Sequence, residues 1–237
     1  MTTVLDIAGI DVRVVRKDVR NLHLSVLPPG GTVRVTAPKW MGEEAIRLFA
    51  LGKLGWIKRQ RGRMRGQERE PAREYVDRES HQVWGQRYLL KVVEQEAAPC
   101  IELRHRKLVM RVRPGTDGAR REGILYGWYR DQMRQALPAL LDRWGALAGV
   151  LPTQVHIQRM KTKWGSCNPD NASIRLNTEL AKKPPECLDY ILLHELVHLR
   201  EPSHGPAFVQ TMDRLMPQWR DRRDALNRLP VRDVWAS

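Results

Sequence analysis

The strongest constraint on the fold is a short run late in the chain, His194-Glu195-Leu196-Val197-His198. Its apolar surroundings predict a buried helix. Residues four positions apart lie on one face of a helix, so both imidazoles can reach a single metal ion. Glu195 points about a quarter-turn away, which leaves its carboxylate placed to act on a water molecule at that ion. Burying these three groups without a partner would be costly. The run therefore predicts a metal-activated hydrolase.

A catalytic zinc site needs a third protein ligand and one open position. We expect His204 to be this ligand, because Pro202 and Pro206 predict a turn between two helices that brings its imidazole back towards the ion. Glu201 competes, but we expect its side chain to point outward from the helix end. We expect Zn²⁺, although Ni²⁺, Co²⁺ or Mn²⁺ could occupy such a site.

Composition narrows the class of protein further. The chain has 237 residues, of which 42% are hydrophobic, and 41 Lys and Arg against 27 Asp and Glu give it a net charge of +14. This length suits one large domain or two small ones, and the charge suggests an anionic partner. The three cysteines form no CxxC pair, so we expect no disulfide framework and a cytoplasmic location. Neither a signal peptide nor a membrane span is expected.

Alternating and helical patterns predict an α+β fold with a strand-rich N-terminal lobe. Two domains are predicted, a basic lobe over residues 1–115 and a zincin-like metal-hydrolase domain over residues 116–237. The sequence shows no internal repeat. The lobe is predicted to contain an antiparallel meander (12–15, 22–27 and 32–36), a helical stretch (43–69) and a strand pair (82–93 and 101–112).

The second predicted domain begins with a long helix over residues 117–147, which Pro138 should kink or split. Short strands follow at 153–160 and 173–176, separated by a turn-rich segment. Two helices are predicted to close the chain.

Several of these motifs together resemble the YgjP-like family of zinc metallopeptidases, which is related to the SprT-like and WLM metallopeptidases. The resemblance covers about residues 158–219 and rests on Lys163-Trp164-Gly165-Ser166-Cys167, Ile174-Arg175-Leu176-Asn177, the HExxH run, His204 and Phe208. It implies a zincin-type core with His194, His198 and His204 as metal ligands and Glu195 as general base. It also implies a metallopeptidase, although one branch of the family is assigned a nucleoside triphosphate pyrophosphatase activity with UTP as substrate.

The substrate stays open between these two reactions. A peptide would bind along an edge strand near residues 173–177 by β-augmentation, with Asn177 orienting a carbonyl. A nucleotide would need several cations that converge on the metal. The candidate cations are Lys161, Lys163, Arg175 and Arg200, and no glycine-rich phosphate loop supports them.

Two residues of the same segment have plainer interpretations. Trp164 is expected to pack at the floor of the cleft, with base stacking as the alternative. Cys167 is expected to be a small buried residue in a tight turn instead of a nucleophile or metal switch.

The basic residues 53–69 suggest one more partner. They could form a nucleic-acid contact surface, which would make the protein a DNA-associated protease of the SprT-like kind or a nucleic-acid-binding module. A solvated helical face is the alternative. The preferred prediction is a zinc-dependent hydrolase that acts on peptide bonds.

Overall fold

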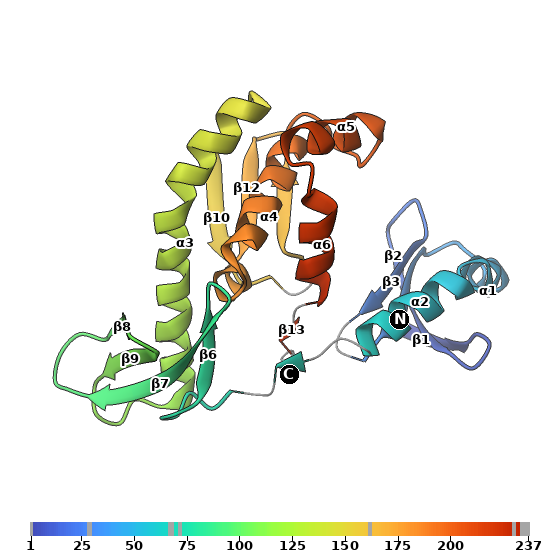
Figure 1. The fold of residues 1–237 in the computed structure, drawn as a ribbon. Helices are drawn as coiled ribbons and strands as arrows, with labels where there is room; N and C mark the ends of the chain where they lie inside the picture. Colours follow the sequence, from blue (N-terminus) through green and yellow to red (C-terminus); the bar gives the residue numbers. More distant parts are fainter. Residues whose placement is uncertain are drawn as a thin grey trace. The chain divides into compact units, whose positions relative to one another are not determined.

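The computed structural model describes residues 2–27, 30–65, 69–70, 73–160, 163–228 and 231–232. The chain divides into two compact units, residues 1–72 with 230–237 and residues 73–229 (Figure 1). The predicted division at 115/116 differs from this one. Residues 73–115 belong to the second unit because their strands share a core with the helices that follow, as Leu90 and Met110 do with Tyr129 and Leu192.

The first unit contains a four-stranded sheet with two helices. Its elements are β1 (Thr2–Asp6), β2 (Asp11–Lys17), β3 (His23–Leu27), β4 (Thr32–Pro38), α1 (Glu43–Gly52) and α2 (Leu54–Arg65). The strand order is β1-β2-β4-β3, and β2 pairs with β4 in parallel. The predicted antiparallel meander was therefore wrong for this pair, and β1 was missed. A tight turn at Ala8-Gly9, both with positive φ, connects β1 to β2.

One face of this sheet forms the core of the first unit. Alternating side chains such as Val12, Val14, Val33 and Val35 are buried together with residues of α1 and α2. The single helical stretch predicted over 43–69 is two helices that part at Lys53. Two short strands, β5 (Arg69–Glu70) and β13 (Val231–Arg232), pair in parallel within the same unit.

The second unit begins with a sheet of the same arrangement as the first. Its strands are β6 (Ser80–Val83), β7 (Gln86–Glu94), β8 (Cys100–Arg104) and β9 (Lys107–Val112). The order is β6-β7-β9-β8, with antiparallel outer pairs and a parallel central pair, as in β1-β2-β4-β3. The chain thus contains a structural repeat that its sequence does not reveal.

A long helix, α3 (Gly118–Ala148), follows this sheet. Asp117 caps it by accepting a hydrogen bond from the Arg120 amide at 2.8 Å, and it ends at Gly149 in the left-handed conformation. Pro138 lies inside α3 without splitting it. The buried face of α3 packs on the β6–β9 sheet and on the helices that carry the candidate site.

A second, three-stranded sheet positions the site. It consists of β10 (Gln154–Gln158), β11 (Gly165–Asn168) and β12 (Ser173–Asn177) in the order β10-β12-β11. Strand β12 pairs with β10 in parallel and with β11 antiparallel, so it is the central strand. The prediction that residues 173–177 form an open edge was therefore wrong. The two edges are β10 and β11, and β11 falls in the segment predicted to be turn-rich.

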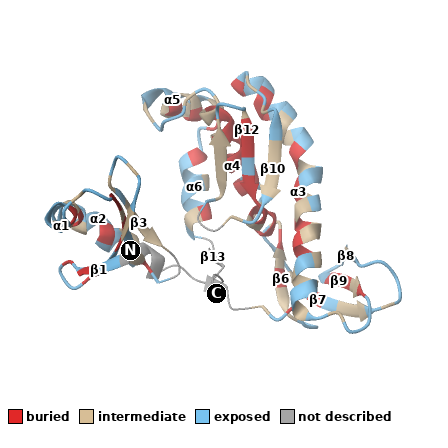
Figure 2. Ribbon diagram, turned by 180° about the vertical axis from the view of Figure 1, so that it is seen from behind, coloured by how far each residue is buried: buried red, intermediate tan, exposed pale blue. Residues whose placement is uncertain are grey.

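Three α-helices close the chain where two were predicted. After the 3-10 helix η1 (Thr178–Lys182) come α4 (Pro185–His198), α5 (Pro206–Leu215) and α6 (Trp219–Arg228). Helix α4 is buried along most of its length (Figure 2). The buried Asp189 carboxylate of α4 accepts hydrogen bonds from Trp144 of α3 and Arg222 of α6, which ties the three helices together. None of the helices in the described part of the chain has the length and apolar character that a membrane span requires.

Candidate metal centre

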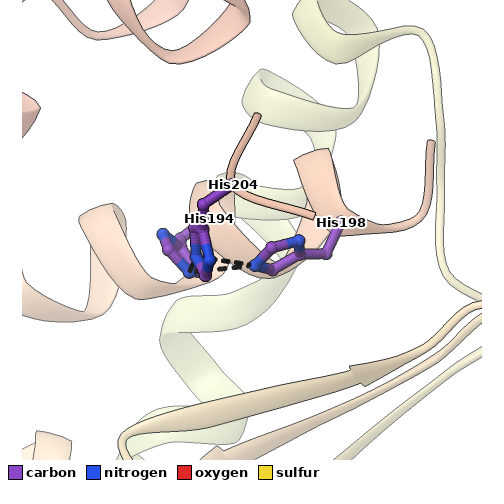
Figure 3. Close-up of side chains that lie close together, drawn as sticks. All are labelled: His194, His198 and His204. Carbon is purple, nitrogen blue, oxygen red and sulfur yellow. Dashed lines mark hydrogen bonds between the residues drawn. The ribbon is translucent and has the colours of Figure 1, made fainter. Parts of the chain in front are cut away.

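Three histidines meet at the end of α4. His194 and His198 lie one helical turn apart, and His204 reaches them from the turn before α5. Each pair of Nε2 atoms lies 3.1 Å apart, so the three nitrogens form an equilateral triangle (Figure 3). Among the described residues, these three histidines form a group whose ligand atoms lie close enough together to hold a metal ion. The sequence therefore predicted correctly that these three side chains converge.

The geometry of this triangle fits a small divalent ion. Four-coordinate zinc with Zn–N bonds of about 2.0–2.1 Å places its nitrogens roughly 3.3 Å apart, close to the separation found here. Burial, followed by the neighbouring His198 and His204, lowers the pKa of His194 to about 3. Burial also lowers the pKa of His198. These lowered pKa values favour unprotonated nitrogens on His194 and His198, which metal binding requires.

Neighbouring groups hold the rings in place. The Nδ1 atom of His198 lies 2.9 Å from the Glu201 carbonyl oxygen, an arrangement that directs Nε2 towards the triangle. Glu201 thus acts through its backbone, a role that the sequence did not suggest. The Phe208 ring packs against all three imidazoles, with centroids 4.7–5.0 Å apart. Tyr190 contacts His194 edge-on.

Glu195 follows His194 directly in α4, and it is buried, with 5% of the residue exposed. Burial raises its pKa to about 7, and the nearby positive charge of Lys163 opposes part of this rise. The carboxylate lies against the backbone of β11, since a Cβ atom on Gly165 would come within 2.5 Å of Glu195 Oε1. The structure therefore brings two predicted site residues, Glu195 and Lys163, close together.

Asn177 has a different role from the one predicted. Its Nδ2 donates to the carbonyl oxygens of Met160 at 2.9 Å and Lys163 at 2.8 Å, and its Oδ1 accepts from the Glu179 amide at 3.2 Å. With its amide fully used, Asn177 holds the loop that carries Lys163 and has no group left to orient a substrate carbonyl.

Two of the predicted cations, Arg175 and Arg200, lie away from the candidate site. Arg175 alternates along β12 with Leu176, which pairs directly with Gly165 on the side of α4. Its exposed side chain therefore lies on the opposite face of the sheet. The Arg200 guanidinium donates to the Ala148 carbonyl oxygen at 3.3 Å, at the end of α3. Lys161 lies outside the described residues.

Trp164 packs against the core as expected, whereas Cys167 lies half-buried in strand β11 and not buried in a tight turn as predicted. The half-buried Trp164 ring packs against the main core of the second unit. Burial, and to a smaller extent the charge of Glu195, raises the pKa of the Cys167 thiol to about 11, so the thiol stays protonated.

The open edge of β11 lies next to Glu195. The amide of Asn177 donates to the Trp164 carbonyl oxygen at 2.8 Å, which makes these two residues a hydrogen-bonded pair of the ladder. Such pairs alternate with non-bonded ones in antiparallel strands. In the register found here, the backbone groups of Gly165 and Cys167 therefore point outward from the sheet. An extended chain could pair with them.

The family of the chain follows from a match that covers most of its sequence. The family described as "YgjP-like, metallopeptidase domain" matches residues 20–229. The chain belongs to the YgjP-like family. This confirms the resemblance seen in the sequence motifs, and membership of a metallopeptidase family implies a metal-dependent hydrolase. The match extends across most of the first unit as well as the whole of the second.

Two solved structures are similar to parts of this YgjP-like protein. The metallopeptidase zymogen of Pyrococcus abyssi abylysin is 22% identical, with a TM-score of 0.36, and the match covers 39% of this chain and 97% of that one. The metallopeptidase zymogen of Methanocaldococcus jannaschii jannalysin is 21% identical, with a TM-score of 0.34, and the match covers 37% and 90%. No curated protein matches the chain.

Proposed function

We propose that this YgjP-like protein is a zinc-dependent peptidase with a zincin-like site, in which His194, His198 and His204 bind the ion and Glu195 is the general base. The observation that supports this most directly is the triangle of Nε2 atoms, 3.1 Å on each side. The buried residue Glu195 follows one of the three histidines directly in α4 and is not itself part of the triangle. Three ligands leave a coordination position open, as catalysis requires.

The bound zinc, Glu195 and Lys163 have separate roles in the proposed hydrolysis. Zinc, when bound, supplies Lewis acidity, which makes water acidic enough to react near neutral pH and polarises the substrate carbonyl. Glu195 accepts the proton of the attacking water and later donates it to the leaving amine nitrogen. Lys163 places a positive charge near Glu195 and favours its ionised form.

The substrate that we propose is an extended peptide bound along β11. The outward backbone groups of Gly165 and Cys167 support this choice, because an added strand would use them as hydrogen-bond partners. This strand replaces residues 173–177 as the proposed peptide site. It lies directly over Glu195, which suits cleavage of the bound backbone.

Nucleotide hydrolysis is less well supported by the same site. A triphosphate needs several cations around the metal. Of the described candidates, Lys163 lies near Glu195, whereas Arg175 is on the far face of the sheet and Arg200 binds the end of α3. The arrangement therefore favours a peptide.

Replacing Glu195 by Gln tests the proposal. The change keeps the size of the side chain but removes its ability to accept a proton, so we expect the zinc content to persist and cleavage of denatured casein to fall about 10²–10⁴-fold. Glu201→Gln is the matched control, since Glu201 acts through its carbonyl oxygen, and it should retain activity. Full activity of the Glu195→Gln protein would refute the assignment of the base.

The same preparations also test the choice of substrate. Zinc-loaded wild-type protein is incubated with denatured casein, short peptides and nucleoside triphosphates, with His194→Ala as the metal-site control. Cleavage of casein that His194→Ala abolishes would support the peptidase. Release of pyrophosphate without cleavage of any peptide would overturn it.

A further inference from the structure

The sheet of the first unit has one face that its helices leave uncovered. Helices α1 and α2 lie on one side of the sheet (Figure 1). Their buried residues share a core with Val12 and Val33, which therefore face the helices. Side chains alternate along a strand, so neighbouring residues such as Arg13 and Arg34 lie on the opposite side, where both are exposed. Val4, on the same side, is 54% exposed. We call this side the outer face.

Two arginines lie next to each other at the centre of the outer face. Arg13 on β2 and Arg34 on β4 are direct partners in the register of the two central strands. Like charges in this position destabilise a sheet. Neither guanidinium has an acidic partner among the described residues. The ion pair found in this part of the structure joins two other residues, Arg47 and Glu43. The pair therefore suits an anion from outside the unit.

The second sheet provides a comparison within the same chain. It has the same strand order and orientations, and its equivalent face also carries cations. There, however, Glu102 binds both Arg111 and Arg104, the latter at 3.0 Å, and Lys91 lies 3.4 Å from Asp77. The absence of such pairing at Arg13 and Arg34 is thus a property of this surface and not of the sheet type.

The side chains around Arg34 suit phosphate as the anion, whereas Asp11, two positions before Arg13 on the same side, bounds the basic area on β2. Ser25 pairs directly with Arg34, and Thr32 and Thr36 lie on the same side of β4, so hydroxyl donors flank the guanidinium groups. Arginine and hydroxyl side chains are common phosphate ligands in nucleic-acid complexes. Residues 1–72 contain 14 Lys and Arg against 7 Asp and Glu, so the unit as a whole would attract a polyanion. Seven of these cations belong to residues 53–69, so the two arginines, and not the total charge, single out the outer face.

We propose that the outer face binds the phosphate backbone of a nucleic-acid duplex. The four strands contain no Trp, Tyr or Phe, and their single aromatic ring is the small imidazole of His23, so they offer no extended platform for the stacking of unpaired bases. Contacts would then be made to phosphates alone, and binding would be independent of sequence and sensitive to salt. This surface differs from the one predicted over residues 53–69, whose described helix, α2, packs on the other side of the sheet.

Binding of the full-length protein to a fluorescein-labelled 20-base-pair DNA duplex tests this proposal. The variant Arg13→Ala/Arg34→Ala should bind about tenfold more weakly at low salt. The slope of log K against log salt should fall by about 2, because roughly one ion is released per phosphate contact. Its melting temperature should stay the same or rise, since the substitutions remove a repulsive pair.

Two matched variants make the result specific. Lys91→Ala/Arg104→Ala removes two cations from the equivalent face of the second sheet and should bind DNA like the wild type. Lys58→Ala/Arg59→Ala removes exposed cations of α2 and should have a smaller effect than the outer-face variant. Wild-type binding by the outer-face variant, or equal losses in all three variants, would overturn the proposal.

Two further measurements distinguish duplex binding from lipid binding and from an effect on the peptidase site. Vesicles of phosphatidylserine provide phosphate without a duplex, and binding to them but not to DNA would also overturn the proposal. Cleavage of casein by Arg13→Ala/Arg34→Ala should equal that of the wild type. Equal cleavage would show that loss of DNA binding does not arise from damage to the peptidase site, so the two proposals are tested separately.

Discussion

Gly165→Ala is expected to displace the proposed general base without touching the metal ligands. A Cβ atom at this position would lie 2.5 Å from Glu195 Oε1, 2.8 Å from Glu195 Cγ and 2.9 Å from Ile191 Cγ2. Ordinary van der Waals contacts begin near 3.4 Å, so the carboxylate oxygen would have to move by about 0.9 Å. Because Glu195 is buried, the carboxylate has little room to move elsewhere.

A displacement of this size has a large effect on catalysis. A shift of about 1 Å in a reacting group can reduce the rate roughly 10²-fold, so we expect casein cleavage by Gly165→Ala to fall by about this factor. The overpacked core should also lose about 1–3 kcal/mol of unfolding free energy. Zinc content, measured by mass spectrometry, should equal that of the wild type.

The control for this variant is Gly123→Ala in α3, where a new Cβ atom would meet nothing within 4 Å. It should retain activity and stability. Full activity of Gly165→Ala with its zinc bound would refute the argument that the glycine makes room for Glu195. Loss of zinc in proportion to the loss of activity would refute it as well, because the effect would then lie in the ligands.

Three other predictions address the metal, the helix packing and the thiols. Zinc at 100 times its Kd should stabilise the metal-free wild type by about 2.7 kcal/mol and raise its Tm by roughly 5–10 °C. A similar rise in Tm for the His204→Ala variant would exclude His204 as a ligand. In urea denaturation, Arg222→Ala should lower the free energy of unfolding by about 2–3 kcal/mol, because it leaves the buried Asp189 carboxylate without its cation. Arg220→Ala, which removes an exposed ion pair, should lower it much less, and equal losses would contradict the role of the buried pair. At pH 8, a thiol with a pKa of about 11 is about 0.1% ionised, so mass spectrometry should find iodoacetamide on the exposed Cys100 well before the half-buried Cys167. The reverse order would contradict the raised pKa of Cys167.

The histidine cluster was predictable from sequence because its geometry is local. A spacing of four residues places His194 and His198 on one helical face, and a short turn returns His204 to them. The family resemblance pointed to the same residues. The α+β class was also predictable, since the alternating and helical patterns lie within single elements.

The roles of the neighbouring residues depend on pairings that the sequence does not display. Strand β11 consists of Gly-Ser-Cys-Asn, which lacks the β-branched and aromatic residues typical of strands. Because β11 was not recognised in the sequence, nothing indicated that β12 is the central strand or that Arg175 faces away from α4. The role of Asn177 in holding the loop that carries Lys163 was missed for the same reason. Helix α6 was missed because its sequence is strongly charged, and its buried side chains include only Trp219 and Leu226 among the described residues.

The shortness of β11 also bears on self-association. An unpaired strand edge is a template for pairing with other copies of the chain, and proteins limit this risk by keeping edge strands short. Strand β11 has four residues, and its register exposes the backbone groups of two of them, Gly165 and Cys167. Pro169, which has no amide hydrogen, follows directly and prevents the ladder from being extended in that direction. This edge can therefore remain exposed without promoting aggregation of the protein.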